Sequence, residues 1–340
     1  MLARTLELKF KGVKVGETPM LVPSFSSKVS PKLDQLVELA AEFITEQVLV
    51  SAYDIYHKKL KIIPTFASLI FLDSGGYECS EQADLSEIGY SSAEPEKGLK
   101  KAAKQQKKWR EEEYCAVVTT WATNLEGSHI VIVSYDHPDK RQPVHEQIAS
   151  AERLLSQRDD IMKEILVKPD KKENLYLNIE EIILNIKLLQ VFDIVGVTEK
   201  ELGKSVLERM VNIARIRLAM EKEGFTRPLH IFGSLDPLST PLYFASGADI
   251  FDGLTWLRYS FVDGYGVYWQ NIAARKWPSA PISAVLRKNM IDNYYYLIEL
   301  RDQMTTFVHD GDFRNFDKNA KTIKKVYRSL ESKLSRMKEV

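Results

Sequence analysis

The stretch SLIFLDSGGYE, residues 68–78, passes from four apolar residues to an acid, a hydroxyl, two glycines and an aromatic side chain. A short apolar run without alternation is typical of a strand that is covered on both faces, as in a parallel sheet. Gly75 and Gly76 permit positive φ and let the backbone approach a flat ligand closely. A plain strand-to-loop turn would use the same residues. The stretch therefore predicts a buried strand and makes its carboxyl end a candidate binding site.

Similar apolar runs recur along the chain, separated by stretches long enough for a helix. Amphipathic segments with apolar residues three and four apart lie at 30–43, 145–166, 178–190 and 201–224. This alternation predicts a (β/α)8 barrel of the TIM type, although an open doubly wound sheet would have the same periodicity. The eight predicted strands are residues 20–24, 47–52, 68–73, 129–136, 174–179, 192–197, 228–233 and 248–252.

Two regions interrupt the alternation. Residues 78–114 are polar and charged, with a lysine-rich helical section, and are interpreted as an insertion after the third strand. After about residue 285 the sequence becomes helical to the end. We therefore expect a barrel domain over residues 1–285 and a C-terminal helical extension over residues 286–340.

The composition excludes several classes of protein. Lysine plus arginine and aspartate plus glutamate each number 47, so the net charge is zero and a polyanion would have to meet a local basic patch. The two cysteines, Cys79 and Cys115, are too few for a disulfide scaffold or for a site built on three thiolates. No signal peptide or membrane-spanning run is recognisable, which favours a cytoplasmic protein with no membrane partner.

Three of the predicted strands end in an acid: Asp73, Asp136 and Asp252. A single aspartate at a strand end often caps the helix or turn that follows. In a parallel barrel, however, the chemistry is carried by the carboxyl ends of the strands. Three acids gathered there would raise each other's pKa, which is more typical of a functional site than of a cap.

Three motifs, together with the order of the strands, resemble the tRNA-guanine transglycosylase family over about residues 15–270. They are TPMLVPS (18–24), LDSGGYE (72–78) and HIFGSLDPLSTPLYFASGADIFDG (230–253). That family has a (β/α)8 barrel and exchanges guanine in a polynucleotide for a 7-deazaguanine. The resemblance implies a pentosyltransferase that binds guanine and a preQ0-like 7-deazaguanine base and needs no cofactor.

The resemblance also assigns roles to individual residues. Asp252 matches the family's nucleophile, which attacks C1′ of the target nucleoside, and Asp73 matches the acid that handles protons on the two bases. Asp136 matches the acid that reads the amide and amino edge of the purine. The remaining positions matched to the base pocket are Ser74, Gly75, Gly76, Asn178, Gly196 and Val197, and Tyr77 offers a ring on which a base can stack. His230, inside a predicted strand, is interpreted as a core residue.

The sequence departs from the family pattern in features that concern the binding of the polynucleotide. No cysteine follows Cys115, so the family's zinc site is not expected. Glu78 replaces the family's glutamine, and Arg258 is the sole cation in GLTWLRYSFVDGYG, residues 253–266. These differences favour DNA over tRNA as the substrate and leave room for an accessory protein subunit. A tRNA enzyme, a non-catalytic transglycosylase-like subunit and a hydrolase of free nucleosides remain as alternatives.

Basic residues supply the candidate contacts to the polymer. Lysine and arginine on a helix bind phosphates without reading sequence, although a run of this kind is more often a solvated helix face. The candidates are Arg258 and, in the insertion, Lys100, Lys101, Lys104, Lys107, Lys108 and Arg110.

Overall fold

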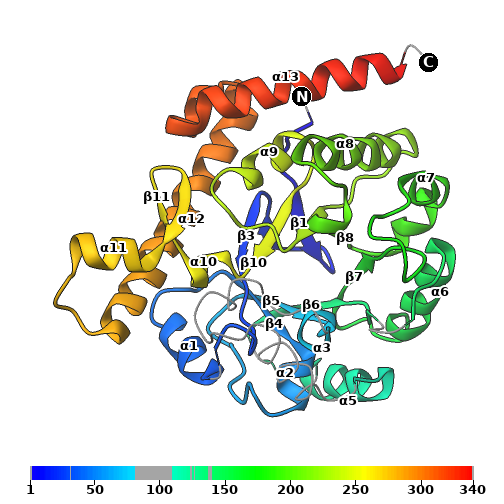
Figure 1. Cartoon of the computed structure of the whole chain (residues 1–340). Helices are drawn as coiled ribbons and strands as arrows, with labels where there is room; N and C mark the ends of the chain where they lie inside the picture. Colours follow the sequence, from blue (N-terminus) through cyan, green and yellow to red (C-terminus); the bar gives the residue numbers. More distant parts are fainter. Residues whose placement is uncertain are drawn as a thin grey trace.

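A computed structural model describes residues 2–30, 32–80, 109–122, 125, 127–136 and 140–338. At its centre lies an eight-stranded parallel sheet with helices around it (Figure 1). In chain order its strands are β3 (Met20–Pro23), β4 (Gln47–Ser51), β5 (Leu69–Asp73), β6 (His129–Val133), β7 (Met162–Val167), β8 (Ile194–Thr198), β9 (Leu229–Phe232) and β10 (Ile250–Gly253).

The sheet almost closes on itself. Its strands are hydrogen-bonded in the order β3-β10-β9-β8-β7-β6-β5-β4, which leaves β3 and β4 as the two ends. These ends meet through a parallel bridge between Ser24 and Leu49, where Phe25 N donates to Leu49 O at 2.9 Å. The predicted α/β architecture is therefore confirmed as a TIM-like barrel.

Helices cover the outside of the barrel (Figure 1). The sequence starts two of them with side-chain caps: Asn178 accepts from Glu181 N, and Ser205 accepts from Glu208 N. The helices that accompany the sheet are α1 (Leu33–Ala40), α2 (Ala52–Tyr56), α3 (Gly76–Cys79), α5 (Glu111–Ala122), α6 (Val144–Leu155), α7 (Ile179–Leu184), η1 (Ile186–Val191), η2 (Glu199–Glu201), α8 (Val206–Lys222), α9 (Ser239–Ala245) and α10 (Thr255–Arg258).

The prediction of the fifth strand was wrong. Residues 174–179 form a loop that leads into α7, and the strand is β7, which lies inside the segment predicted as one helix over 145–166. Glu164 explains the error, because a charged residue interrupts the apolar run and mimics a helical pattern. In the structure Glu164 is fully buried and paired inside the barrel, which the local sequence does not reveal.

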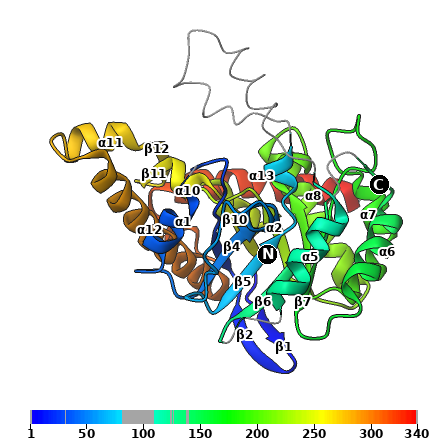
Figure 2. The same cartoon turned by 90° about the horizontal axis from the view of Figure 1, so that it is seen from below.

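Alternation along the strands separates two cores. One set of side chains fills the barrel interior, including Leu69, Phe71 and Ile250, while the other packs against the helices. The hairpin of β1 (Glu7–Phe10) and β2 (Val13–Glu17) adds Leu8 to the interior set and covers the amino-terminal end of the barrel (Figure 2). Because the amino-terminal end is packed with apolar residues, the opposite end is the one available to a ligand.

The chain after the barrel packs into the same core as the barrel itself. α13 lies along α8 and α9 on the outside (Figure 1), and apolar residues of α12 and α13 join the core cluster under the helices. The extension begins with α12, a few residues before its predicted start. The elements after α10 are the hairpin β11 (Tyr259–Val262) and β12 (Tyr265–Tyr268), then α11 (Trp269–Lys276), α12 (Ile282–Asp310), η3 (Phe313–Asn319) and α13 (Ala320–Lys338).

Most of the predicted insertion, residues 81–108, lies outside the described residues; the described part includes the beginning of α5, which continues beyond the insertion to Ala122. Within the described ranges, no helix combines the length and the apolarity that crossing a membrane requires.

Candidate active site

A cavity of about 390 Å³ opens at the carboxyl ends of the barrel strands. This volume is in the range of small-molecule binding sites. Its wall includes the three acids predicted from the strand ends, together with other charged residues from the loops. The charged residues that line it are Asp73, Glu78, Asp136, Glu199, Glu201 and Asp252, with Arg141, Lys168, Lys200 and Arg258.

Asp252 is held at the inner end of this cavity. It follows Ile250 by two positions on β10 and so faces the barrel interior, where it is only 6% exposed. Ser24 Oγ donates to its Oδ2 at 2.7 Å, and Gly233 N donates to its Oδ1 at 2.9 Å. Because donors from two neighbouring strands hold the two oxygens, the carboxylate has a fixed orientation and acts as an acceptor.

Asp73 lies across the same cavity, at the end of β5. Gly75 N donates to its Oδ2 at 3.0 Å, which favours the ionised form. Burial has the opposite and larger effect, and the negative charges of Glu78, Asp252 and Asp136 add to it, so the pKa of Asp73 is raised to about 8. At neutral pH this carboxyl group therefore carries a proton that it can donate.

The two glycines of the opening motif are required by packing. Gly75 has φ +89°, and a Cβ atom there would lie 2.5 Å from Tyr53 Cβ on α2. At Gly76 a Cβ atom would lie 2.5 Å from Asp136 Oδ2. The motif thus lets the turn after β5 fit under α2 and lets Asp136 come close to the backbone beside Asp73.

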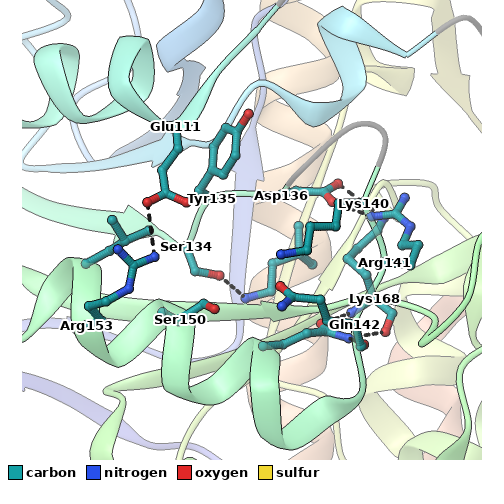
Figure 3. Close-up of a pocket in the computed structure, with 14 residues that line it drawn as sticks. Glu111, Ser134, Tyr135, Asp136, Lys140, Arg141, Gln142, Ser150, Arg153 and Lys168 are labelled. Carbon is teal, nitrogen blue, oxygen red and sulfur yellow. Dashed lines mark hydrogen bonds and ion pairs between the residues drawn. The ribbon is translucent and has the colours of Figure 1, made fainter.

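Asp136 is engaged by cations in the structure. Arg141 Nη1 lies 2.6 Å from its Oδ1, and Lys168 Nζ lies 3.7 Å from its Oδ2 (Figure 3). Lys168 also pairs with Glu201 at 2.8 Å. Each carboxylate oxygen has a second lone pair, so Asp136 retains the capacity to accept from a ligand while these cations hold it.

Tyr77 stands at the edge of the cavity between two cations. Arg258 Nη2 donates to its hydroxyl at 2.9 Å, and Lys28 Nζ lies 4.4 Å from the centre of its ring. Lys28 therefore covers one face of the ring by a cation–π contact.

Some of the predicted base-pocket residues do not line the cavity. Asn178 is exposed and caps α7. The residue that follows the fifth strand of the sheet, β7, and lines the cavity is Lys168. Val197 is buried on the outer side of β8, against the helices. Gly196 faces the barrel interior below the cavity, where Phe232 and Glu164 surround it. Ser74, in contrast, is buried beside Asp73 and lines the cavity.

The candidate polymer contacts are placed only in part. Arg258 lines the cavity, whereas Arg110 is exposed and paired with Glu113 at 3.3 Å. The five lysines of the predicted basic patch lie outside the described residues: Lys100, Lys101, Lys104, Lys107 and Lys108.

His230 is more than the core residue that the sequence indicated. It is fully buried, but its Nε2 lies 3.4 Å from Asp252 Oδ1 and its Nδ1 lies 2.7 Å from Glu164 Oε1. Burial disfavours the protonated ring, yet the two carboxylates outweigh it and raise the pKa of His230 to about 9. A histidine and a glutamate at inward-facing positions of two barrel strands were the signal that could have identified this contact.

Among the described residues, no cluster of three or more histidine, cysteine, aspartate or glutamate side chains is arranged to hold a metal ion. No protein-family model matches the chain, and no curated protein matches it.

Proposed function

We propose that this protein is a transglycosylase that replaces guanine in a nucleic acid with a 7-deazaguanine base. One observation carries the proposal: two carboxyl groups in different states face one cavity of the size of a small ligand. Asp252 is fixed by donors as an acceptor, and the raised pKa of Asp73 keeps a proton on it at neutral pH. A nucleophile and a proton donor are the pair that substitution at an anomeric carbon needs.

The first half of the reaction forms a covalent intermediate. A carboxylate oxygen of Asp252 bonds to C1′ while the bond from C1′ to the base nitrogen breaks. The electron pair of that bond leaves with guanine, which takes the proton of Asp73. The developing positive charge at C1′ is stabilised by the neighbouring carboxylate.

The second half returns both acids to their starting states. The entering 7-deazaguanine gives its ring proton to Asp73, and its nitrogen bonds to C1′. The bond between C1′ and Asp252 breaks, and its electron pair returns to the carboxylate. Two displacements at one carbon retain the configuration, and no proton is gained or lost overall.

Asp136 is the group that selects the base in this proposal. Its carboxylate lines the cavity, and the donor edge of guanine, an amide N–H and an amino group, matches a pair of acceptor oxygens. Arg141 and Lys168 hold the carboxylate in place, and the lack of a side chain at Gly76 leaves room for it.

DNA is the proposed polymer, with tRNA as the competing one, because the sequence lacks the cysteines of the family's zinc site and has Arg258 as the sole cation in residues 253–266. A buried catalytic cavity requires the target base to leave its stack or to come from a single strand. An accessory subunit that opens duplex DNA is consistent with this requirement.

The test is exchange of radiolabelled guanine into single-stranded DNA, duplex DNA and tRNA, with trapping of a covalent protein–nucleic acid adduct. We expect label in DNA, and more than about a 10³-fold loss with Asp252→Asn. Asp302→Asn, a surface change at an acid with 70% side-chain exposure, is the control. Label in tRNA alone would change the polymer, whereas hydrolysis of free nucleosides, or full exchange by Asp252→Asn, would overturn the proposal.

A further inference from the structure

Below the cavity, three buried ionisable side chains form a line across the barrel interior. Glu164 comes from β7, His230 from β9 and Asp252 from β10, and their exposed fractions are 0%, 0% and 6%. His230 lies between the two acids, with one ring nitrogen facing each: 2.7 Å to Glu164 and 3.4 Å to Asp252. Glu164, at one end of this line, is not among the residues that line the cavity, and Asp252, at the other end, is the proposed nucleophile.

The geometry defines the protonation state of the central ring. A carboxylate oxygen only accepts hydrogen bonds, and a neutral imidazole has one donor nitrogen and one acceptor nitrogen. Nδ1 is hydrogen-bonded to Glu164, whereas Nε2 is buried without a hydrogen-bond partner among the described residues and faces Asp252 Oδ1 at 3.4 Å. Both contacts with carboxylates are favourable only when both nitrogens carry a proton. The charged groups that raise the pKa of His230 are Glu164 and Asp252, and aromatic rings pack against it, with Phe232 stacked at 3.9 Å between ring centroids and Phe71 at its edge.

A glycine on the intervening strand makes the line possible. β8 runs between β7 and β9, and Gly196 is level with Leu166 on one side and His230 on the other. A Cβ atom at Gly196 would lie 2.9 Å from Glu164 Oε1 and 2.5 Å from a ring carbon of Phe232. Any larger residue would push Glu164 and Phe232 away from His230, so the fold leaves this position open for their contact.

We propose that Glu164 and His230 are positioning residues that act through Asp252 in both halves of the exchange. In the resting enzyme, the imidazolium holds Asp252 as an oriented carboxylate. In the covalent intermediate Asp252 is a neutral ester, and Glu164 compensates the charge that remains on His230. When the entering base attacks, the same imidazolium stabilises the carboxylate as it departs. The inference rests on the proposed function, because it concerns the role of Asp252.

Measurements of the rate of adduct formation and of DNA binding distinguish a positioning role from a purely structural one. With Glu164→Gln, which preserves size, we expect adduct formation to slow on the order of 100-fold, with little change in the binding of DNA, since a misoriented nucleophile affects the chemical step. Gly196→Ala should have a similar effect, although it removes no ionisable group. Asp302→Asn is the control, because it removes a carboxylate whose side chain is 70% exposed and leaves the buried charges in place. Wild-type rates in a folded Glu164→Gln protein would overturn the inference.

An NMR titration of the ring nitrogens of His230 tests the pair without any activity. The wild-type signal, assigned by its loss in His230→Gln, should report a doubly protonated ring at pH 7.5, and in Glu164→Gln a neutral one. A neutral wild-type ring at that pH would overturn the inference, whatever the exchange rates of the variants. If instead Asp252→Asn exchanges bases normally, the proposed function fails, while the titration still reports on the pair.

Discussion

Two buried groups of charges lie at opposite ends of the barrel. At the amino-terminal end, Arg217 and Asp249 form an ion pair with both side chains fully buried, and Leu229 N also donates to Asp249. At the carboxyl end, Asp73 and Asp252 share one cavity with four further acids and four cations. Two arginines face Asp249 in the first group, since Arg4 Nε also lies 3.9 Å from its Oδ1, while the second group keeps an excess of acid and shifts the pKa of Asp73 to about 8.

The difference separates stabilising chemistry from reactive chemistry. A buried carboxylate paired with an arginine is costly to disturb, because burial raises the pKa of Asp249 and the neighbouring Arg217 opposes that rise. A carboxyl group crowded by other acids is held in a state that favours proton transfer, and it lowers the stability of the fold at higher pH. The amino-terminal end is packed with apolar residues, and the carboxyl end has the cavity and the residues that the proposed reaction needs.

Removing the acid at each end should have opposite consequences for stability and for exchange activity, and this is the largest expected effect. Asp249→Asn leaves Arg217 buried without its counter-ion, so we expect a loss of about 3–5 kcal/mol in the free energy of unfolding. Asp252→Asn removes one of several acids and should change stability by less than about 1 kcal/mol, while it abolishes exchange. Urea unfolding and exchange rates of both variants provide the comparison, and a destabilised Asp252→Asn with normal rates would reverse it.

Stability should fall as pH rises, with Asp73 as a main cause. Its pKa is about 8 in the folded protein and near 4 when unfolded, so between these values the folded state binds more protons. The stabilisation is complete below pH 4 and is lost as pH rises through 8. His230 has the same sign, between about 6.5 and 9.

Asp73→Asn should make this dependence shallower. We expect its free energy of unfolding to fall less steeply than that of the wild type from pH 6 to 8, by up to about 1.4 kcal/mol per pH unit. Urea titrations at each pH measure the difference. Parallel curves for the two proteins would show that Asp73 ionises normally in the folded state, and the proposed proton donor would then be lost.

The smallest expected effect compares one glycine from each end. Gly12 in the β1–β2 turn and Gly75 after β5 both have positive φ, but only Gly75 has neighbours where a Cβ would lie. Gly12→Ala should cost about 1 kcal/mol from backbone strain. Gly75→Ala should cost about 1–3 kcal/mol more, because Tyr53 must move. Equal thermal shifts would show that the turn beside Asp73 is not tightly packed.

The sequence was sufficient to predict a strand wherever a local run of apolar residues determines it. Runs such as 68–73 and 248–252 were placed within two residues of β5 and β10, because buried parallel strands are continuously apolar and end in turn residues. The acids at their ends were found for the same reason. The fifth strand was missed because Glu164 breaks the apolar pattern, and Lys168 was missed with it.

By itself, the sequence determined the alternation of strands and helices and the positions of Asp73 and Asp252 at strand ends, since both follow from local periodicity. Asp136, predicted to end a strand, lies three residues after β6, which ends at Val133. Only the tertiary structure decided that Glu164 reaches His230 across Gly196, that Arg141 and Lys168 hold Asp136, and that Asp73 keeps its proton. The physical reason is that a charge state depends on burial and on neighbours from other strands, which are distant along the chain and adjacent only in the closed barrel.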